Sequence, residues 1–224
     1  MPDPSKLVAH RGFAGKHPEN TLEALEAAFR LGVLKVEFDV QLAGDTTPVM
    51  LHDTTLERTL DIKESVFNLN SSDLKGIETL EQVVSWLLEK HDVVAFVELK
   101  QESIGNHGLS NCVKKVAEVC APVIERCVFI SFNAAACGLA KASGFKLMGW
   151  VLPCYDRISA KVLKGLNPDY VFCDKNYLPE GEGHLWTGAW KWVIYEVGTK
   201  GLALSLMNRG VHLLETKQLH ELID

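Results

Sequence analysis

Two acids and two histidines in the first quarter of the chain have the residue types of a metal-assisted acid–base site. Glu37 and Asp39 alternate with apolar residues, so a strand here would turn both carboxylates to one face. Two such carboxylates repel each other and lose hydration if buried, unless a cation compensates them. His10 and His52 each end an apolar, strand-like run on either side of this segment. An imidazole titrates near neutral pH and can serve as general acid or base.

Further charged residues fit a phosphate ester. Glu98 and Lys100 end another apolar run, and Arg11 directly follows His10. Glu98 joins the two acids at positions 37 and 39, and three hard oxygen donors suit Mg²⁺ or Ca²⁺ better than zinc. Arg11 offers a permanently charged fork for phosphate oxygens. One divalent cation, Arg11, Lys100 and two histidines describe a site for a phosphate ester.

Structural roles stay open for the same residues. The pair of Glu37 and Asp39 is also typical of an exposed edge strand. Lys100 would form a salt bridge to either acid, and Arg11 an ion pair with Glu19 or Asp39. The six cysteines show no CxxC pair and are expected to be reduced, mostly buried thiols.

The elements that must position these residues begin with a strand, a helix and a strand. An apolar strand at residues 7–10 leads to a helix with Asn20 as the expected N-cap and Glu23 three residues later. The strand at residues 36–40 follows, which makes a parallel βαβ unit. Residues 41–48 are too short for a crossover helix, so residues 48–52 should return antiparallel and bring His52 over the site. We expect an insertion over about residues 41–78.

Apolar runs typical of strands then alternate with helical segments. The further strands are predicted at residues 93–99, 127–131, 146–151, 170–173, 190–195 and 211–214. Helices are predicted at residues 80–90, 108–120, 134–142, 157–165, 180–188, 199–208 and 217–223. With the first two strands this gives eight βα units, which predict one α/β domain over residues 1–224 with the (β/α)8 TIM barrel fold. In such a barrel the active site lies at the carboxyl ends of the strands, where the candidate residues fall.

Composition excludes several classes of partner. The 224 residues carry a formal net charge of −6, so a nucleic-acid partner is not expected. No apolar run approaches the roughly 20 residues that a membrane helix needs, and the first residues lack the pattern of a secretory signal. We expect a cytoplasmic protein, a monomer or homodimer, that acts on a small molecule.

Several motifs carry a resemblance to a known family. They are His10-Arg11-Gly12, Pro18-Glu19-Asn20-Thr21, Glu37-Phe38-Asp39-Val40, Val49-Met50-Leu51-His52-Asp53 and Glu98-Leu99-Lys100. In order and spacing the chain resembles the glycerophosphodiester phosphodiesterase family, most specifically over residues 7–61. The likeness continues through residues 77–81 and 131–132 and thins afterwards. The family fold is a (β/α)8 barrel with a loop insertion after the second strand.

The resemblance implies hydrolysis of glycerophosphodiesters to sn-glycerol 3-phosphate and an alcohol such as choline, ethanolamine or glycerol. By motif position, it implies that Glu37, Asp39 and Glu98 bind the Mg²⁺ or Ca²⁺. It implies further that His10 and His52 form the acid–base pair, and that Arg11 and Lys100 hold phosphate oxygens. Glu19 would complete the charged network near Arg11. We favour His52 as base and His10 as acid, with the reverse assignment open.

The chain departs from the family pattern towards its end. Relatives often have Trp-Thr-Val-Asn at the seventh strand, where this chain has Trp192-Val193-Ile194-Tyr195. Trp192 is expected to line the glycerol pocket or to serve as a core aromatic, and Tyr195 to reshape the cleft. Glu215-Thr216-Lys217 stands where many relatives have Thr-Asp.

Three other readings compete with this one. A lysophospholipase D or sphingomyelinase D type enzyme shares the barrel, the acids and the histidines. It needs an apolar surface for a lipid tail, and the insertion offers only Val66, Phe67 and Leu69. A non-catalytic barrel or a metal-dependent aldolase or lyase would not need both histidines.

Overall fold

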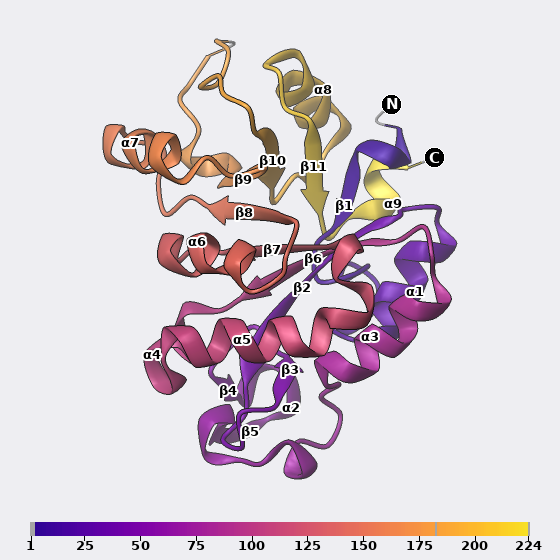
Figure 1. Ribbon diagram of the computed structural model, residues 1–224. Coiled ribbons are helices and arrows are strands. Elements are labelled where there is room, and N and C mark those ends of the chain that lie inside the picture. The colour runs from indigo at the N-terminus through magenta and orange to yellow at the C-terminus, as the bar shows by residue number, and fades with distance from the viewer. Residues whose placement is uncertain (1–2, 182, 224) are drawn as a thin grey trace.

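Eight parallel strands form a closed barrel in the computed structural model, which describes residues 3–181 and 183–223 (Figure 1). The strand order is β1-β11-β10-β9-β8-β7-β6-β2, and β2 pairs with β1 to close the barrel. This confirms the predicted (β/α)8 fold. The bounds of the strands are β1 (Leu7–Ala9), β2 (Lys35–Leu42), β6 (Val94–Leu99), β7 (Cys127–Ser131), β8 (Leu147–Val151), β9 (Tyr170–Asp174), β10 (Lys191–Tyr195) and β11 (Leu213–Thr216).

Helices cover the outside of the barrel, as Figure 1 shows. Their bounds are α1 (Leu22–Arg30), α3 (Leu80–Glu89), α4 (Gln101–His107), α5 (Leu109–Cys120), α6 (Ala134–Ala142), α7 (Arg157–Leu166), α8 (Lys200–Asn208) and α9 (Leu219–Leu222). Among the described residues, every helix is too short or too polar to span a membrane. All six cysteines are free and five are buried, as the sequence predicts.

Strand alternation divides the apolar residues into two cores. Side chains on the outer face, such as Phe38 and Phe129, pack against the helices. Side chains on the inner face fill the barrel itself, and the buried ones include Val8, Phe96, Val128, Ile130, Val151, Phe172 and Val193. Because successive residues of a strand point to opposite faces, neighbouring side chains along one strand belong to different cores. The inner core closes the bottom of the barrel and leaves the carboxyl ends open for a site.

The segment between β2 and α3 forms a small subdomain on the barrel. It contains β3 (Pro48–Met50), β4 (Thr55–Leu56), α2 (Glu57–Leu60) and β5 (Ile62–Ser65). β3 runs antiparallel to β2, with Val40 opposite Met50. Buried side chains give the segment a core of its own, made of Ala43, Val49, Leu51, Leu56, Val66 and Leu74. This core holds the chain that carries His52 against the barrel.

Two local predictions are wrong. Residues 180–181 and 183–188, the described part of the expected helix at 180–188, form no helix. The N-cap of α1 is Thr21, whose side-chain oxygen accepts a hydrogen bond from the Ala24 amide, and not Asn20. Asn20 instead adopts a left-handed backbone with φ +54° and turns its amide towards β2.

Candidate active site

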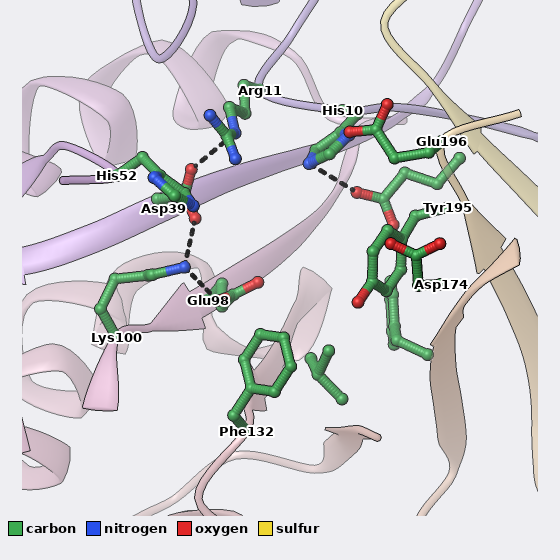
Figure 2. A pocket seen from close by; sticks show the side chains of 13 residues that line it. His10, Arg11, Asp39, His52, Glu98, Lys100, Phe132, Asp174, Tyr195 and Glu196 are labelled. Carbon is green, nitrogen blue, oxygen red and sulfur yellow. Dashed lines mark hydrogen bonds and ion pairs between the residues drawn. The ribbon is translucent and has the colours of Figure 1, made fainter. Parts of the chain in front are cut away.

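Six of the nine predicted site residues line one cavity of about 200 Å³ at the carboxyl ends of the strands (Figure 2). β1 delivers His10 and Arg11, and β6 delivers Glu98 and Lys100. The other lining residues are Asp39, His52, Phe132, Val151, Phe172, Asp174, Tyr195, Glu196 and Glu215. The cavity therefore combines acids, cations, histidines and aromatic rings from most strands of the barrel.

Three buried carboxylates form a set of oxygen donors. One oxygen each from Glu37, Asp39 and Glu98 lies within 4.8 Å of the other two. Glu37 Oε1 is buried without a hydrogen-bond partner among the described residues. Burial, followed by the nearby Asp39 and Glu215 carboxylates, raises the pKa of Glu37 well above its ordinary value. A hard divalent cation would supply the missing partner and the missing positive charge, so these residues fit Mg²⁺ or Ca²⁺.

Asp39 is held in place from several sides. Asn20 donates its amide to Asp39 Oδ2 at 2.9 Å and accepts the Asp39 backbone N–H at 3.0 Å. Lys100 Nζ lies 3.2 Å from Oδ1 and Arg11 Nε 3.0 Å from Oδ2. Burial alone would raise the pKa of Asp39, but Lys100 and Arg11 outweigh burial and hold this pKa below its ordinary value. Asp39 therefore stays ionised in the site.

Arg11 and Lys100 are the two cations at the cavity. Arg11 has a left-handed backbone with φ +56°, and its backbone N–H donates to Glu37 Oε2 at 2.9 Å. Lys100 Nζ donates to Glu98 Oε1 at 2.7 Å. Both side chains are anchored on acids of the site and line the cavity, where they can meet phosphate oxygens.

His10 is buried and surrounded by carboxylates. Its Nε2 lies 3.6 Å from Glu215 Oε1 and 4.0 Å from Glu37 Oε2, and its Nδ1 lies 3.5 Å from Glu196 Oε1. Burial, then Arg11, lowers the pKa of His10 well below its ordinary value. The neutral imidazole is therefore the stable form here.

His52 enters the cavity from the insertion and is oriented by neighbours. Its Nδ1 lies 2.6 Å from Asp53 Oδ1, and its side chain is 34% exposed. Gln41 donates to the His52 backbone carbonyl at 3.1 Å. Arg58 then connects Asp53 to Glu19, which contacts Arg11 at 2.8 Å. A continuous chain of charged contacts thus runs from His52 to Arg11.

Three predicted residues do not line the cavity. Glu37 borders it, since its carboxylate lies beside those of Asp39 and Glu98, which do line it. Glu19 stands behind Arg11 and does not line the cavity. Trp192 faces outwards, where it packs against Trp186 and Trp190 and donates its indole N–H to the Trp186 carbonyl. The structure therefore does not bring Trp192 to this site, because its position on β10 has the parity of the outer face.

Sequence reasoning missed residues from the last three strands. Asp174 ends β9 and Glu196 follows β10, and Glu215 on β11 faces inwards beside His10. Lys217 pairs with Glu196 at 3.1 Å. The sequence did contain a signal for these residues, since an acid stands near the end of each of these strands. Barrel active sites lie at the carboxyl ends of the strands, so these acids could have been assigned to the site.

Comparisons with known proteins agree with this geometry. Residues 10–147 match the model of the glycerophosphoryl diester phosphodiesterase family. A glycerophosphodiester phosphodiesterase of Bacillus altitudinis is 32% identical over 129 residues, which are 51% of this chain and 53% of that protein. Glycerophosphodiester phosphodiesterase 1 of Mus musculus is 42% identical over 115 residues, 44% of this chain and 34% of that protein. The chain thus spans about half the length, or less, of these two relatives.

Solved structures share the whole fold. A phosphodiesterase of Oleispira antarctica, solved in complex with the product sn-glycerol-3-phosphate, superposes with a TM-score of 0.82 at 22% identity. The match covers 97% of this chain and 94% of that one. A glycerophosphodiester phosphodiesterase of Thermotoga maritima gives a TM-score of 0.73 at 18% identity, and the match covers 98% of this chain and 97% of that one. The family match spans more than half of the chain and includes both histidines, the three acids and both cations; the chain therefore belongs to the glycerophosphoryl diester phosphodiesterase family.

Proposed function

We propose that this chain hydrolyses glycerophosphodiesters to sn-glycerol 3-phosphate and an alcohol, with a divalent cation as cofactor. One observation carries the proposal: two histidines, the cationic side chains of Arg11 and Lys100, and a buried set of three carboxylates line or border a single cavity. The family membership and the product named for the Oleispira antarctica structure support the same substrate.

The cation would be held by Glu37, Asp39 and Glu98. When bound, it would neutralise phosphate charge and favour ionisation of the attacking hydroxyl, which belongs to water or to the substrate's own glycerol. Attack by the glycerol hydroxyl would expel the alcohol and leave a cyclic phosphodiester, which a water molecule would then open to sn-glycerol 3-phosphate. Arg11 and Lys100 bind the remaining phosphate oxygens and turn the diester towards the histidines. These two cations are themselves fixed by ion pairs to Asp39 and Glu98.

The two histidines move the protons. His10 takes the proton of the attacking hydroxyl, since its buried ring is stable in the neutral form. His52 protonates the oxygen of the leaving alcohol as the P–O bond breaks, and the Asp53 carboxylate, 2.6 Å from its Nδ1, holds the ring in position. This assignment is the reverse of the one favoured from the sequence.

A lipid-cleaving activity is less well supported. Val66 is buried in the core of the insertion, and Phe67 and Leu69 pack against that core. The residues expected to receive a lipid tail therefore stabilise the insertion instead. A soluble diester fits this surface better.

The test is a coupled assay of glycerophosphodiesters with Mg²⁺, Ca²⁺ or chelator. Glycerol-3-phosphate dehydrogenase reports the product, and the H52A variant serves as the inactive control. We expect product release with a divalent cation and none with chelator. The proposal is abandoned if no glycerol 3-phosphate forms with any of these metals.

A further inference from the structure

Glu215 is a buried acid at the cavity to which the proposed function gives no role. It is 3% exposed, and its Oε2 has no hydrogen-bond partner among the described residues. It lies on β11, in the segment where this chain departs from the pattern of its relatives. A buried carboxylate oxygen without a partner is costly, so its presence calls for a cation or a hydrogen-bond donor.

Glu215 belongs to a second group of possible metal ligands. One ligand atom each from His10, Glu37 and Glu215 lies within 4.8 Å of the other two. His10 Nε2 lies 3.6 Å from Glu215 Oε1 and 4.0 Å from Glu37 Oε2. Two atoms that bind one zinc ion at about 2.1 Å and a tetrahedral angle lie roughly 3.4 Å apart. His10 therefore already lies close to the spacing from both acids that a shared ion requires.

The ring of His10 is oriented for such an ion. Its Nδ1 lies 3.5 Å from Glu196 Oε1, and Figure 2 shows these two side chains next to each other. A carboxylate beside Nδ1 favours the tautomer with the proton on this nitrogen, which leaves the lone pair on Nε2. That lone pair then faces two carboxylates, which is repulsive unless a cation lies between them. Burial lowers the pKa of His10 well below its ordinary value, so a proton does not take the place of the cation.

The two groups of ligands differ in the ions that they prefer. Glu37, Asp39 and Glu98 offer oxygen atoms alone, which suits Mg²⁺ or Ca²⁺. The second group adds an imidazole nitrogen, and three protein ligands of nitrogen and oxygen type are typical of a zinc site with one open position. Because Glu37 belongs to both groups, the two sites lie side by side. A softer ion thus has a place of its own next to the activating cation.

We propose that His10, Glu37 and Glu215 form an inhibitory zinc site. The inference rests on the proposed function, in which His10 takes the proton of the attacking hydroxyl. With zinc on Nε2 and a proton on Nδ1, the ring has no free lone pair and cannot accept that proton. Free zinc therefore switches the enzyme off while Mg²⁺ or Ca²⁺ is present.

The first experiment measures zinc binding itself, by competition with a chromophoric zinc chelator. It compares the wild type with E215Q and with E98Q, in which glutamine keeps the size of the side chain and removes one charge. E98Q is the matched control, because Glu98 belongs to the three-acid group alone. We expect E215Q to bind zinc at least about tenfold more weakly than the wild type, and E98Q to lose far less.

A readout on the wild type makes the test independent of how the variants fold. Nitrogen NMR follows the imidazole resonances, and those of His10 are identified by their absence from H10A. Zinc should shift the Nε2 resonance of His10, whereas Mg²⁺ at the three acids should leave Nε2 without a direct bond and shift it far less. A His10 resonance that zinc does not move would overturn the proposed site.

Inhibition is the third readout. Release of glycerol 3-phosphate is followed at saturating Mg²⁺ while free zinc is raised with a zinc buffer, and each protein is compared with its own zinc-free rate. Half-inhibition of E215Q should need at least about tenfold more zinc than half-inhibition of the wild type. D73N, which removes an exposed acid of the insertion, should be inhibited at the wild-type zinc concentration.

The outcomes separate the two claims. Unchanged zinc affinity in E215Q, or a loss in E98Q as large as the loss in E215Q, overturns the second site, since zinc then binds elsewhere or among the three acids. Zinc binding without inhibition overturns the inhibitory role. If the wild type releases no glycerol 3-phosphate with any divalent cation, the proposed function is refuted, and the zinc affinities and the NMR shift still decide whether the site exists.

Discussion

At the scale of single residues, the two histidines occupy different environments and differ in how far they are buried. His10 is buried, and Lys217 and Arg11 add positive charge near it, so burial and both cations lower its pKa. A divalent cation held by Glu37 would act in the same direction. His52 is partly exposed, and its Nδ1 contacts the Asp53 carboxylate, which orients the ring. A base and an acid can thus coexist in one small cavity.

This assignment predicts different responses to the leaving group. H10A and H52A should each lower kcat on glycerophosphocholine by about 100-fold or more. With a p-nitrophenyl diester of glycerol phosphate, whose leaving group departs without protonation, H52A should regain most of the lost rate and H10A should not. Steady-state kinetics on the two substrates measures this. Recovery by H10A instead would show that the roles are reversed.

Asn20 shows how a residue can be placed correctly in a motif and still be misread. Its side chain is a good N-cap by type, and the sequence gives no reason to prefer Thr21. Asparagine tolerates a left-handed backbone, and in this conformation the Asn20 side-chain amide donates a hydrogen bond to Asp39. The pairing joins residues nineteen positions apart, so local pattern could not reveal it.

At the scale of elements, periodic patterns predicted the strands and most helices well. The helix expected at 180–188 failed because Gly181, Gly183 and Gly188 lower helix propensity in a segment held by tertiary contacts. In that segment the Trp186 ring stacks on Tyr155 at 3.7 Å between centroids.

The side chains of the last strands were harder to place than the strands themselves. Trp192 and Tyr195 differ in parity, so only one of them can face the cavity, and register decides which. Glu215 lies more than a hundred residues from Glu98 in sequence, and only closure of the barrel brings both to one cavity. The cluster of Glu37, Asp39 and Glu98 was predictable because its two strands come early in the chain and place these acids near their carboxyl ends.

One side chain, that of Asp45, links the turn after β2 to the later part of the insertion. Asp45 accepts hydrogen bonds from the Ser71 N–H at 2.9 Å, the Ser71 hydroxyl at 2.8 Å and the Thr47 N–H at 3.0 Å. Burial slightly raises the pKa of Asp45, but the hydrogen bonds from Ser71 and Thr47 outweigh it and lower this pKa to about 2. The ionised form is therefore the one that stabilises the insertion.

We expect D45N to lower the thermal midpoint at neutral pH, and the deficit to shrink in acid. Because the folded pKa lies below the ordinary value, the stabilisation is complete above about pH 4 and is lost as pH falls towards 2. Thermal unfolding of both proteins at pH 7 and pH 3 measures the difference. D73N removes an exposed acid from the same insertion and should show a smaller deficit at pH 7. An equal deficit for D45N at both pH values would contradict the ionised anchor.

At the scale of the whole molecule, the barrel concentrates buried negative charge in one place. Glu37, Asp39, Glu98 and Glu215 are all buried at the cavity. Arg11 and Lys100 supply only two positive charges against them. Burial of an excess charge without a partner is costly, so this site lowers the free energy of unfolding of the barrel. Binding of a divalent cation should raise the free energy of unfolding again.

Cation binding should therefore stabilise the whole barrel. At a hundredfold excess over Kd, a ligand that binds only the folded state adds about 2.7 kcal/mol. For a chain of this size that corresponds to a rise of roughly 5–10 °C in the thermal midpoint. Calorimetry of chelator-treated protein, before and after Mg²⁺ or Ca²⁺ is added, measures this rise.

Removal of one buried acid separates the cost of the charge from the gain on binding. In E37Q the amide oxygen can still accept the Arg11 N–H, and one uncompensated charge is gone. In chelator this variant should unfold at or above the wild-type midpoint, because its core carries less repulsion. E125Q, which removes an exposed acid from the helical turn before β7, is the matched control. Added cation should then raise the midpoint of the wild type and of E125Q, and leave the midpoint of E37Q unchanged. An equal rise in all three proteins would show that the cation stabilises the chain somewhere other than this cavity, and the carboxylates would then need a different explanation.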